Sequence, residues 1–306
     1  MKVDVMIPTY KPGEKLLQTL QRLLSQTLTP NHIWIVNTEE AYWNPKLEKL
    51  SSKISVQHIK KSEFDHGATR NLGVSQSKAD VILFMTDDAV PADEHMIERM
   101  VRYFKKEKTA AVYARQLPNE DCSPLERYTR AFNYPDTPKV KGKEDIKGMG
   151  IKTFFCSNVC AAYRRELFVK RGGFTFPTIF NEDMIYCGGL VKDGYYVAYA
   201  ADACVYHSHN YTPVQQLRRN FDLGVSQADH PEVFSGISSE SEGIRLVKQT
   251  AKHFIQEKQP GVVISLIVQS GYKFLGYQLG KHYKKLSRKM IMSLTMNQAY
   301  WKKEEK

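Results

Sequence analysis

The first 115 residues alternate between short apolar runs and longer stretches in which apolar residues recur every three or four positions. Such runs are typical of buried strands, and such periodic stretches are typical of amphipathic helices. We expect strands at residues 2–8, 32–37, 55–59, 81–85 and 110–114, and helices near residues 16–24, 67–77 and 96–104. The alternation predicts an α/β fold with a parallel, doubly wound sheet and helices on both faces.

The pattern after residue 118 is less regular. Residues 119–150 are rich in charge, Pro and Gly, which predicts loops around one helix. Further elements are expected as strands at 154–163 and 195–207 and as a helix at 182–192, and helices with a basic face follow from about residue 231. We therefore expect one domain over residues 1–230, with halves that meet at residue 115, and a helical region over residues 231–306.

Polar residues follow several of the predicted strands. Thr9 follows the first strand, Asn37, Thr38 and Glu39 close the second, and an acidic pair follows the strand at 81–85. In sheets of this kind, ligands bind beyond the carboxyl ends of the strands. These side chains are therefore candidates for a ligand-binding site.

The acidic pair is Asp87-Asp88. Two adjacent carboxylates are costly without a cation, and a hard divalent ion bound also by substrate phosphates would remove that cost. The alternative is a helix N-terminus, because Pro91 and Asp93 follow. The pair alone leaves both interpretations open.

A second acidic pair, Glu182-Asp183, opens the helix predicted at 182–192. The helix dipole favours acidic residues in a first turn, but a carboxylate can also serve as the general base for a hydroxyl nucleophile. His207 and His209 close the last predicted strand. A lone histidine is usually structural, and the alternative at a strand end is a metal ligand.

The segment from His66 to Asn71 opens another predicted helix. Backbone amides at a helix start can face phosphate, and Arg70 can add charge-assisted hydrogen bonds. The alternative is an ordinary loop with an exposed arginine. The segment is neither a Walker loop nor a Gly-x-Gly-x-x-Gly motif.

Composition and charge narrow the class of protein. The chain has 306 residues, of which 42% are hydrophobic and 25% are charged, so a disordered protein is excluded. Five cysteines without a Cys-x-x-Cys pair, and no apolar signal region at residues 1–5, predict a cytoplasmic protein with reduced thiols. The net charge is +11, and residues 245–306, with 13 Lys or Arg and 3 Asp or Glu, carry +10 of it. This asymmetry favours an anionic partner, either a membrane surface or a nucleic acid.

The basic C-terminal region contains a second periodic pattern. Its apolar positions at helical spacing are Tyr283, Leu286, Met290, Ile291 and Leu294, with lysines and arginines between them. This pattern predicts a basic amphipathic helix on an anionic membrane surface. The alternatives are a helix packed on the main domain and a contact in a homodimer. The apolar run at 262–268 is too short to span a bilayer, and the lack of nucleic-acid motifs argues against a nucleic-acid partner.

The motifs, taken in order, resemble those of the family 2 inverting glycosyltransferases of the GT-A fold, over roughly residues 2–212. They are Ile7-Pro8-Thr9-Tyr10, Ala68-Thr69-Arg70-Asn71, the run from Leu83 to Ala89, Gly172-Gly173-Phe174, Glu182-Asp183 and His207. This resemblance implies a Rossmann-like mixed, mostly parallel sheet with helices on both faces. Within the family, three segments look most like bacterial rhamnosyltransferases, which use dTDP-rhamnose to build cell-surface polysaccharides. These segments are residues 64–71, 86–91 and 205–212.

The resemblance implies a role for each motif. The family's metal motif is Asp-x-Asp, and Thr86 replaces its first Asp here. Asp88 matches the retained Asp and is expected to bind Mg²⁺ or Mn²⁺ with the help of Asp87. His207 matches a histidine that completes the metal site. Asp183 matches the catalytic base, with Glu182 as its neighbour.

The resemblance also implies a binding site for a nucleotide sugar. Its expected residues are Thr9, Asn37, Thr38, Glu39, Asp65, His66, Arg70, Asp87 and Asn158. Among these, Arg70 matches a contact to the diphosphate. Residues 37–39 fall where the family uses Asp to recognise the base, and the departure from Asp leaves uracil and thymine both open. Ser157-Asn158 matches the pocket for the sugar and the acceptor.

The implied activity is inverting transfer of L-rhamnose from dTDP-rhamnose to a hydroxyl of a lipid-linked saccharide. The enzyme is expected as a peripheral protein on the inner face of the cell membrane, with residues 1–115 binding the nucleotide sugar and 116–230 binding the acceptor. One alternative is transfer of a hexose or N-acetylhexosamine from a UDP-sugar. An alternative of another class is a non-catalytic protein that binds nucleic acid or membrane through its basic C-terminal region.

Overall fold

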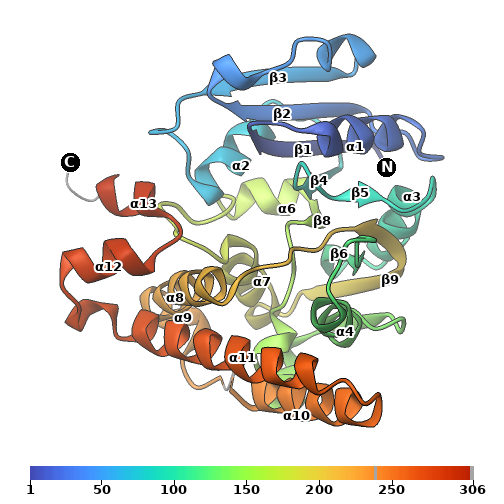
Figure 1. Cartoon of the computed structure of the whole chain (residues 1–306). Coiled ribbons are helices and arrows are strands. Elements are labelled where there is room, and N and C mark those ends of the chain that lie inside the picture. Colours follow the sequence, from blue (N-terminus) through green and yellow to red (C-terminus); the bar gives the residue numbers. More distant parts are fainter. Residues whose placement is uncertain (238–239, 304–306) are drawn as a thin grey trace. The chain divides into compact units, whose positions relative to one another are not determined.

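A mixed β-sheet forms the centre of the first of two structural units (Figure 1). Its strands are β1 (Val3–Tyr10), β2 (His32–Thr38), β3 (Ile54–Ile59), β4 (Val81–Met85), β5 (Val90–Pro91), β6 (Thr109–Leu117), β7 (Lys139–Lys141), β8 (Cys160–Arg164) and β9 (Tyr196–Tyr206). Their order is β3-β2-β1-β4-β8-β6-β9-β5, and β7 pairs with β9 beside that path. The pairs β1–β2, β2–β3, β1–β4 and β6–β9 are parallel, whereas β8 runs antiparallel between β4 and β6. The predicted mixed, mostly parallel sheet is confirmed.

This structure is a computed structural model that describes residues 1–237 and 240–303. Residues 238, 239 and 304–306, which belong to the predicted C-terminal region, lie outside the described residues. The first unit comprises Met1–Leu117, Tyr134–Pro177 and Glu182–His207. The second unit comprises Pro118–Asn133, Thr178–Asn181 and Ser208–Lys306. The predicted boundary at residue 230 falls inside the second unit, and the proposed division at that residue stays a prediction.

Helices cover the sheet of the first unit. They are α1 (Glu14–Leu24), α2 (His66–Val74), α3 (Met96–Val101), α5 (Ile146–Met149), α6 (Arg165–Lys170) and α7 (Glu182–Lys192). Helix α1 shows why they form: Leu16, Leu20 and Leu23 recur at helical spacing, and all three are buried against the strands. One apolar cluster joins this helix to β1, β2, β4, β6 and β9.

Strand direction decides which residues meet at one edge of the sheet. Because β1, β2, β4, β6 and β9 run the same way, their carboxyl ends reach the same edge. Strand β8 runs the other way, and its first residue, Cys160, pairs with Met85, the last residue of β4. The segment just before β8, which contains Asn158, therefore arrives at the same edge.

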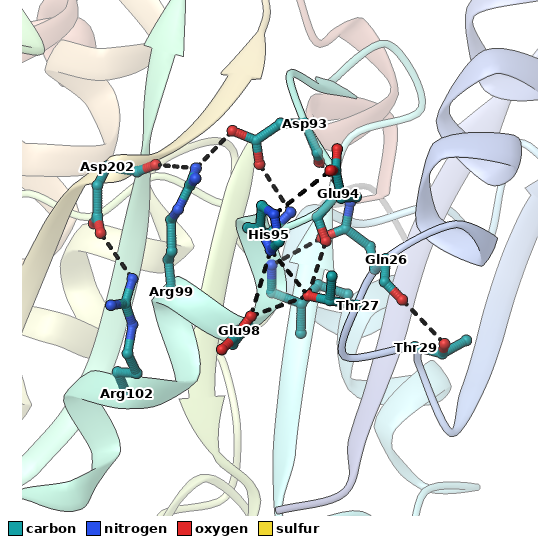
Figure 2. A network of polar contacts seen from close by, with 11 residues as sticks. Gln26, Thr27, Thr29, Asp93, Glu94, His95, Glu98, Arg99, Arg102 and Asp202 are labelled. Carbon is teal, nitrogen blue, oxygen red and sulfur yellow. Dashed lines mark hydrogen bonds and ion pairs between the residues drawn. The ribbon is translucent and has the colours of Figure 1, made fainter.

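A network of charged side chains fixes the segment between β5 and α3 (Figure 2). Asp93 accepts a hydrogen bond from the backbone N–H of His95 at 2.9 Å and pairs with Arg99 at 2.6 Å. Arg99 also donates to the carbonyl oxygen of Asp202 at 2.8 Å, which ties the start of α3 to β9. Helix α3 begins at Met96, so Asp93 lies two residues before its N-cap residue, His95.

The second unit is helical. Its helices are α4 (Pro124–Asn133), α8 (Pro213–Asp229), α9 (Pro231–Phe234), α10 (Glu240–Gln256), α11 (Pro260–Lys281), α12 (Arg288–Leu294) and α13 (Gln298–Lys303). Helices α8 and α11 lie side by side (Figure 1) and approach closely at Gly224, Gly276 and Gly280. A Cβ atom at Gly276 would lie 2.1 Å from the carbonyl oxygen of Leu217, so only glycine allows this approach.

The structure corrects the prediction of one basic amphipathic helix after residue 281. Residues 283–285 form a 3₁₀ turn, and α12 begins only at Arg288, because Ser287 caps it by accepting from the N–H of Met290. Ile291 is buried with Phe221, and three other predicted apolar positions, Tyr283, Leu286 and Leu294, pack against the same cluster, whereas Met290 is exposed. Most of the predicted membrane face is therefore part of the core of the second unit.

Two further expectations are refined. The strand expected at 154–163 begins only at Cys160, and α8 was not expected as a separate helix, although Thr212 and Pro213 form a recognisable helix start. Within the described residues, no helix is both long enough and apolar enough to cross a membrane.

Candidate active site

Asp87 and Asp88 lie directly after β4, at the edge where the carboxyl ends meet. The hydroxyl of Thr9, from β1, donates to Oδ2 of Asp87 at 2.5 Å. Burial raises the pKa of Asp87, the Thr9 hydrogen bond opposes that rise, and the charge of Asp88 adds to it. Helix α3 begins eight residues after Asp88, so neither carboxylate caps it. The interpretation of this pair as a helix N-terminus is therefore excluded.

His207 follows β9 and faces Asp88. Its Nε2 lies 3.5 Å from Oδ1 of Asp88, and its Nδ1 lies 3.1 Å from Oε1 of Gln116. The amide nitrogen of Gln116 donates to Oγ of Ser157 at 3.0 Å, which orients the amide oxygen toward the histidine. With that oxygen as acceptor, Nδ1 carries a proton, and in the neutral imidazole the lone pair is then on Nε2, the nitrogen that faces Asp88.

This arrangement fits a divalent cation. The ligand atoms of Asp88 and His207 lie within 4.8 Å of each other, and a second oxygen donor, Asp87, is adjacent in the chain. A carboxylate oxygen and an imidazole nitrogen form a donor set that suits Mn²⁺ better than Mg²⁺, which prefers oxygen ligands. Gln116 supports the imidazole in the manner usual for metal-binding histidines. His209 is two residues further along the chain, in the second unit.

The second acidic pair opens α7. Oδ2 of Asp183 accepts from the backbone N–H of Asn158 at 2.9 Å, and Oδ1 accepts from the N–H of Met184 at 2.7 Å. Oε1 of Glu182 accepts from the side-chain amide of Asn158 at 3.0 Å and pairs with Arg70 at 3.2 Å. Asn158 therefore holds both carboxylates, one through its backbone and one through its side chain.

The two carboxyl groups differ in their affinity for protons. Burial, together with the charge of Glu182, raises the pKa of Asp183 to about 7. Burial acts against ionisation of Glu182 too, but Arg70, His66 and Asn158 together lower its pKa. Neighbouring acids whose pKa values are driven apart can take separate roles in proton transfer. Here Glu182 stays ionised, and Asp183 can accept or release a proton near neutral pH.

Two supporting residues were not predicted. Gln116 orients His207, and the hydroxyl of Tyr163, a fully buried side chain, donates to Oδ1 of Asn158 at 2.9 Å. Gln116 could have been identified as a candidate because it is a polar residue just after the strand predicted at 110–114. For Tyr163 no local pattern points to the site, because its contact depends on how β8 is inserted into the sheet.

Asp65 and Arg70 organise the start of α2. The carboxylate of Asp65 caps the helix by accepting from the N–H groups of Gly67 and Ala68, both at 2.9 Å. Arg70 donates to the carbonyl oxygen of His66 at 3.0 Å, one turn earlier, and points its charge at Glu182. The contact of Arg70 with a diphosphate stays a prediction.

Residues 37–39 form a separate group at the end of β2. The side-chain amide of Asn37 donates to the carbonyl oxygen of Glu39 at 3.1 Å, and the carboxylate of Glu39 accepts from the N–H of Lys61 at 2.5 Å. Oδ1 of Asn37 and Oγ1 of Thr38 are buried and have no hydrogen-bond partner among the described residues. Buried polar atoms are rarely left so, which makes them suitable for contact with a polar ligand.

Most of the predicted site residues thus fall into three groups, and the remaining two, Asp65 and His66, lie at the start of α2. The first is Thr9, Asp87, Asp88 and His207; the second is Arg70, Asn158, Glu182 and Asp183; the third is Asn37, Thr38 and Glu39. The fold and these groups define the architecture of a GT-A glycosyltransferase. Residues 4–172 match the model of glycosyl transferase family 2, and the chain belongs to this family.

Two curated relatives are similar over nearly the whole chain. The chain is 39% identical over 305 residues to the O-antigen chain rhamnosyltransferase RfbN of Salmonella typhimurium, covering 98% of this chain and 96% of the relative. It is 36% identical over 302 residues to the O-antigen chain rhamnosyltransferase WbaN of Salmonella anatum, covering 97% and 95%. The predicted family is confirmed.

Solved structures confirm the fold. The mannosyltransferase PcManGT of Pyrobaculum calidifontis, solved with GDP-Man and Mn²⁺, has a TM-score of 0.62 at 12% identity, covering 93% of this chain and 88% of that one. TarS of S. aureus, solved with UDP-GlcNAc, has a TM-score of 0.52 at 13% identity, covering 93% and 92%.

Proposed function

We propose that this glycosyltransferase moves L-rhamnose from dTDP-rhamnose to a hydroxyl of a lipid-linked saccharide, with inversion, during synthesis of a bacterial surface polysaccharide. The observation that carries the mechanism is the pair at the start of α7, in which burial and Glu182 raise the pKa of Asp183 to about 7. Transfer to a hydroxyl needs a base of this kind. The choice of rhamnose is supported by the likeness to two rhamnosyltransferases over nearly the whole chain.

Asp183 is the proposed general base. It accepts the proton of the acceptor hydroxyl while the oxygen of that group attacks the anomeric carbon and the bond to the nucleoside diphosphate breaks. A single displacement inverts the anomeric centre. Glu182 stays ionised beside Arg70, and its negative charge keeps Asp183 basic enough to accept the proton.

Asp88 and His207, helped by Asp87, are the proposed ligands of Mn²⁺ or Mg²⁺. The bound ion would supply positive charge that stabilises the departing diphosphate. The chain's own contribution is orientation: Thr9 holds Asp87, and Gln116 directs Nε2 of His207 toward Asp88. The proposal that the enzyme depends on a metal is supported by these ligand atoms and by the contacts that orient them.

The third group, residues 37–39, is the proposed site for the base of the nucleotide. Its support is the pair of buried polar atoms, Oδ1 of Asn37 and Oγ1 of Thr38. Asn158 is proposed to border the sugar, because it contacts both carboxylates of the pair at α7. We place the enzyme on the inner face of the cell membrane, where a lipid-linked acceptor is accessible. A homodimer stays a prediction.

A panel of donors tests the proposal. The purified protein is incubated with dTDP-rhamnose, UDP-hexoses and UDP-N-acetylhexosamines, each with Mg²⁺, Mn²⁺ or EDTA, and release of the nucleoside diphosphate is measured. We expect selective use of dTDP-rhamnose that EDTA abolishes. Preference for a UDP-sugar would keep the mechanism and overturn the donor, and full activity in EDTA would overturn the metal.

A further inference from the structure

Helix α11 presents an apolar face to solvent. Ile264, Ile267 and Phe274 are each more than 60% exposed, at 64%, 63% and 62%, and Val268 and Leu275 are exposed as well. These positions recur three or four residues apart, so they share one side of the helix. The opposite side carries Gly276 and Gly280, which lie against α8.

The exposed face is uncharged along its whole length. Between residues 261 and 275 the exposed positions are Gly261, Ile264, Ile267, Val268, Gly271, Tyr272, Phe274 and Leu275. At a rise of about 1.5 Å per residue, the stretch from Ile264 to Leu275 is roughly 16 Å long. A helix face in water normally carries charged residues, so a contiguous apolar surface of this size indicates a contact with another surface.

The charges around the apolar face of α11 indicate what kind of surface it contacts. Residues 243–303 contain 12 Lys or Arg residues and a single acidic residue, Glu257. The exposed basic positions include Lys248 and Lys252 on the neighbouring α10, Lys258 just before α11, and Lys281, Lys284 and Lys285 at and beyond its end. A second copy of the chain would bring the same positive charge, whereas an anionic lipid surface complements both the apolar face and the lysines.

We propose that α11 is the membrane-docking element, lying in the plane of an anionic bilayer with its apolar face among the lipid chains. The flanking lysines contact lipid phosphates, and Tyr272 lies at the level of the headgroups. The apolar face is shorter than the roughly 20 apolar residues that a spanning helix needs. This role replaces the one predicted for residues 281–294, whose apolar side chains pack mainly inside the second unit. The inference deepens the proposed function and rests on it for the lipid-linked acceptor.

Vesicle sedimentation tests the inference directly. The full chain is mixed with phosphatidylethanolamine vesicles with or without phosphatidylglycerol, in the absence of any sugar donor. We expect binding that needs phosphatidylglycerol, and we expect Ile267→Glu/Phe274→Glu to reduce it by about tenfold or more, because two carboxylates would enter the lipid interface. Val169→Glu, at a 53% exposed position on α6, is the matched control and should bind like the unchanged protein.

Other readouts make the outcome decisive. Circular dichroism melting checks that the double variant folds, and Lys248→Gln/Lys252→Gln offers an independent test, expected to weaken only the preference for phosphatidylglycerol. Equal vesicle binding by all variants would overturn the inference. A dimer that Ile267→Glu/Phe274→Glu converts to a monomer, without any vesicle binding, would assign the face to a second copy instead. Failure of the proposed function would look different: a protein that binds vesicles but does not use dTDP-rhamnose.

Discussion

Two pairs of adjacent acidic residues lie at the same edge of the sheet and balance their charge in different ways. Glu182-Asp183 lies beside Arg70, which keeps one carboxylate ionised while burial lets the other hold a proton. Asp87-Asp88 instead meets the hydroxyl of Thr9 and the imidazole of His207. A pair with an arginine beside it is suited to proton transfer. A pair that meets a hydroxyl and an imidazole is suited to a cation from solution.

The largest effect is expected from Asp183→Asn. The amide can still accept the hydrogen bond from Asn158 but cannot take a proton, so kcat should fall roughly a thousandfold. The affinity for the donor should change little, because the proposed general base acts on the acceptor hydroxyl and not on the donor. Steady-state kinetics and isothermal titration with dTDP would separate the two. Asp193→Asn, at the exposed position just after α7, is the control, and a variant that retains its turnover would rule out Asp183 as the base.

Asp88→Asn should affect both binding and turnover. Loss of one negative oxygen ligand should weaken the metal site and lower kcat/KM on the order of a hundredfold, with partial recovery at high Mn²⁺. Activity measured across a Mn²⁺ titration would show this as a raised half-saturating concentration. The comparison between the pairs would break down if the Mn²⁺ requirement were unchanged in Asp88→Asn but altered in Asp183→Asn.

The pH profile distinguishes the two pairs further. Asp183 works only when deprotonated, so a pKa of about 7 predicts that kcat/KM falls as the pH drops below that value. Glu182→Gln removes the negative charge that raises this pKa, so the acid limb should move to lower pH, by roughly one unit. Glu166→Gln, an exposed glutamate in the first turn of α6, should leave the limb in place. A shift to higher pH would contradict the proposed coupling.

The smallest effect is expected at Thr9. Thr9→Val removes the hydroxyl that donates to Asp87 and should raise the pKa of that carboxyl further. The ionised fraction then falls, and Mn²⁺ affinity should weaken about fivefold, more at acid than at alkaline pH, as the loss of one hydrogen bond suggests. Thr9→Ser keeps the hydroxyl and should restore the affinity. Equal defects in both variants would show that the hydroxyl is not the cause.

The sequence predicted the elements that depend on local pattern. Strand β4 and helix α7 begin and end at the predicted residues, since the apolar run stops at Thr86 and the acidic first turn marks Glu182. The family motifs then identified both acidic pairs as candidates. Their separate electrostatic environments, however, come from residues distant in the chain, such as Arg70 and Gln116.

What could not be predicted depends on long-range packing. Asn158 reaches both carboxylates because β8 is inserted antiparallel beside β4, and no local pattern reveals strand direction. Most of the apolar positions predicted after residue 281 do pack on one cluster, but the prediction that these positions contact a membrane was wrong. Leu286 and Ile291 are apolar because they pack against the second unit's own cluster, and the sequence does not distinguish that surface from lipid.

The glycine contact between α8 and α11 gives α11 two faces that should respond differently to mutation. A Cβ at Gly276 or Gly280 would lie 2.1 Å from a carbonyl oxygen of α8, so saturation mutagenesis should find that arc intolerant. The arc with Ile264 and Phe274 contributes little to folding, because both side chains are largely exposed. In a deep mutational scan, substitutions on the glycine side of α11 should thus lower the stability of the protein, whereas substitutions on the exposed side should change its localisation.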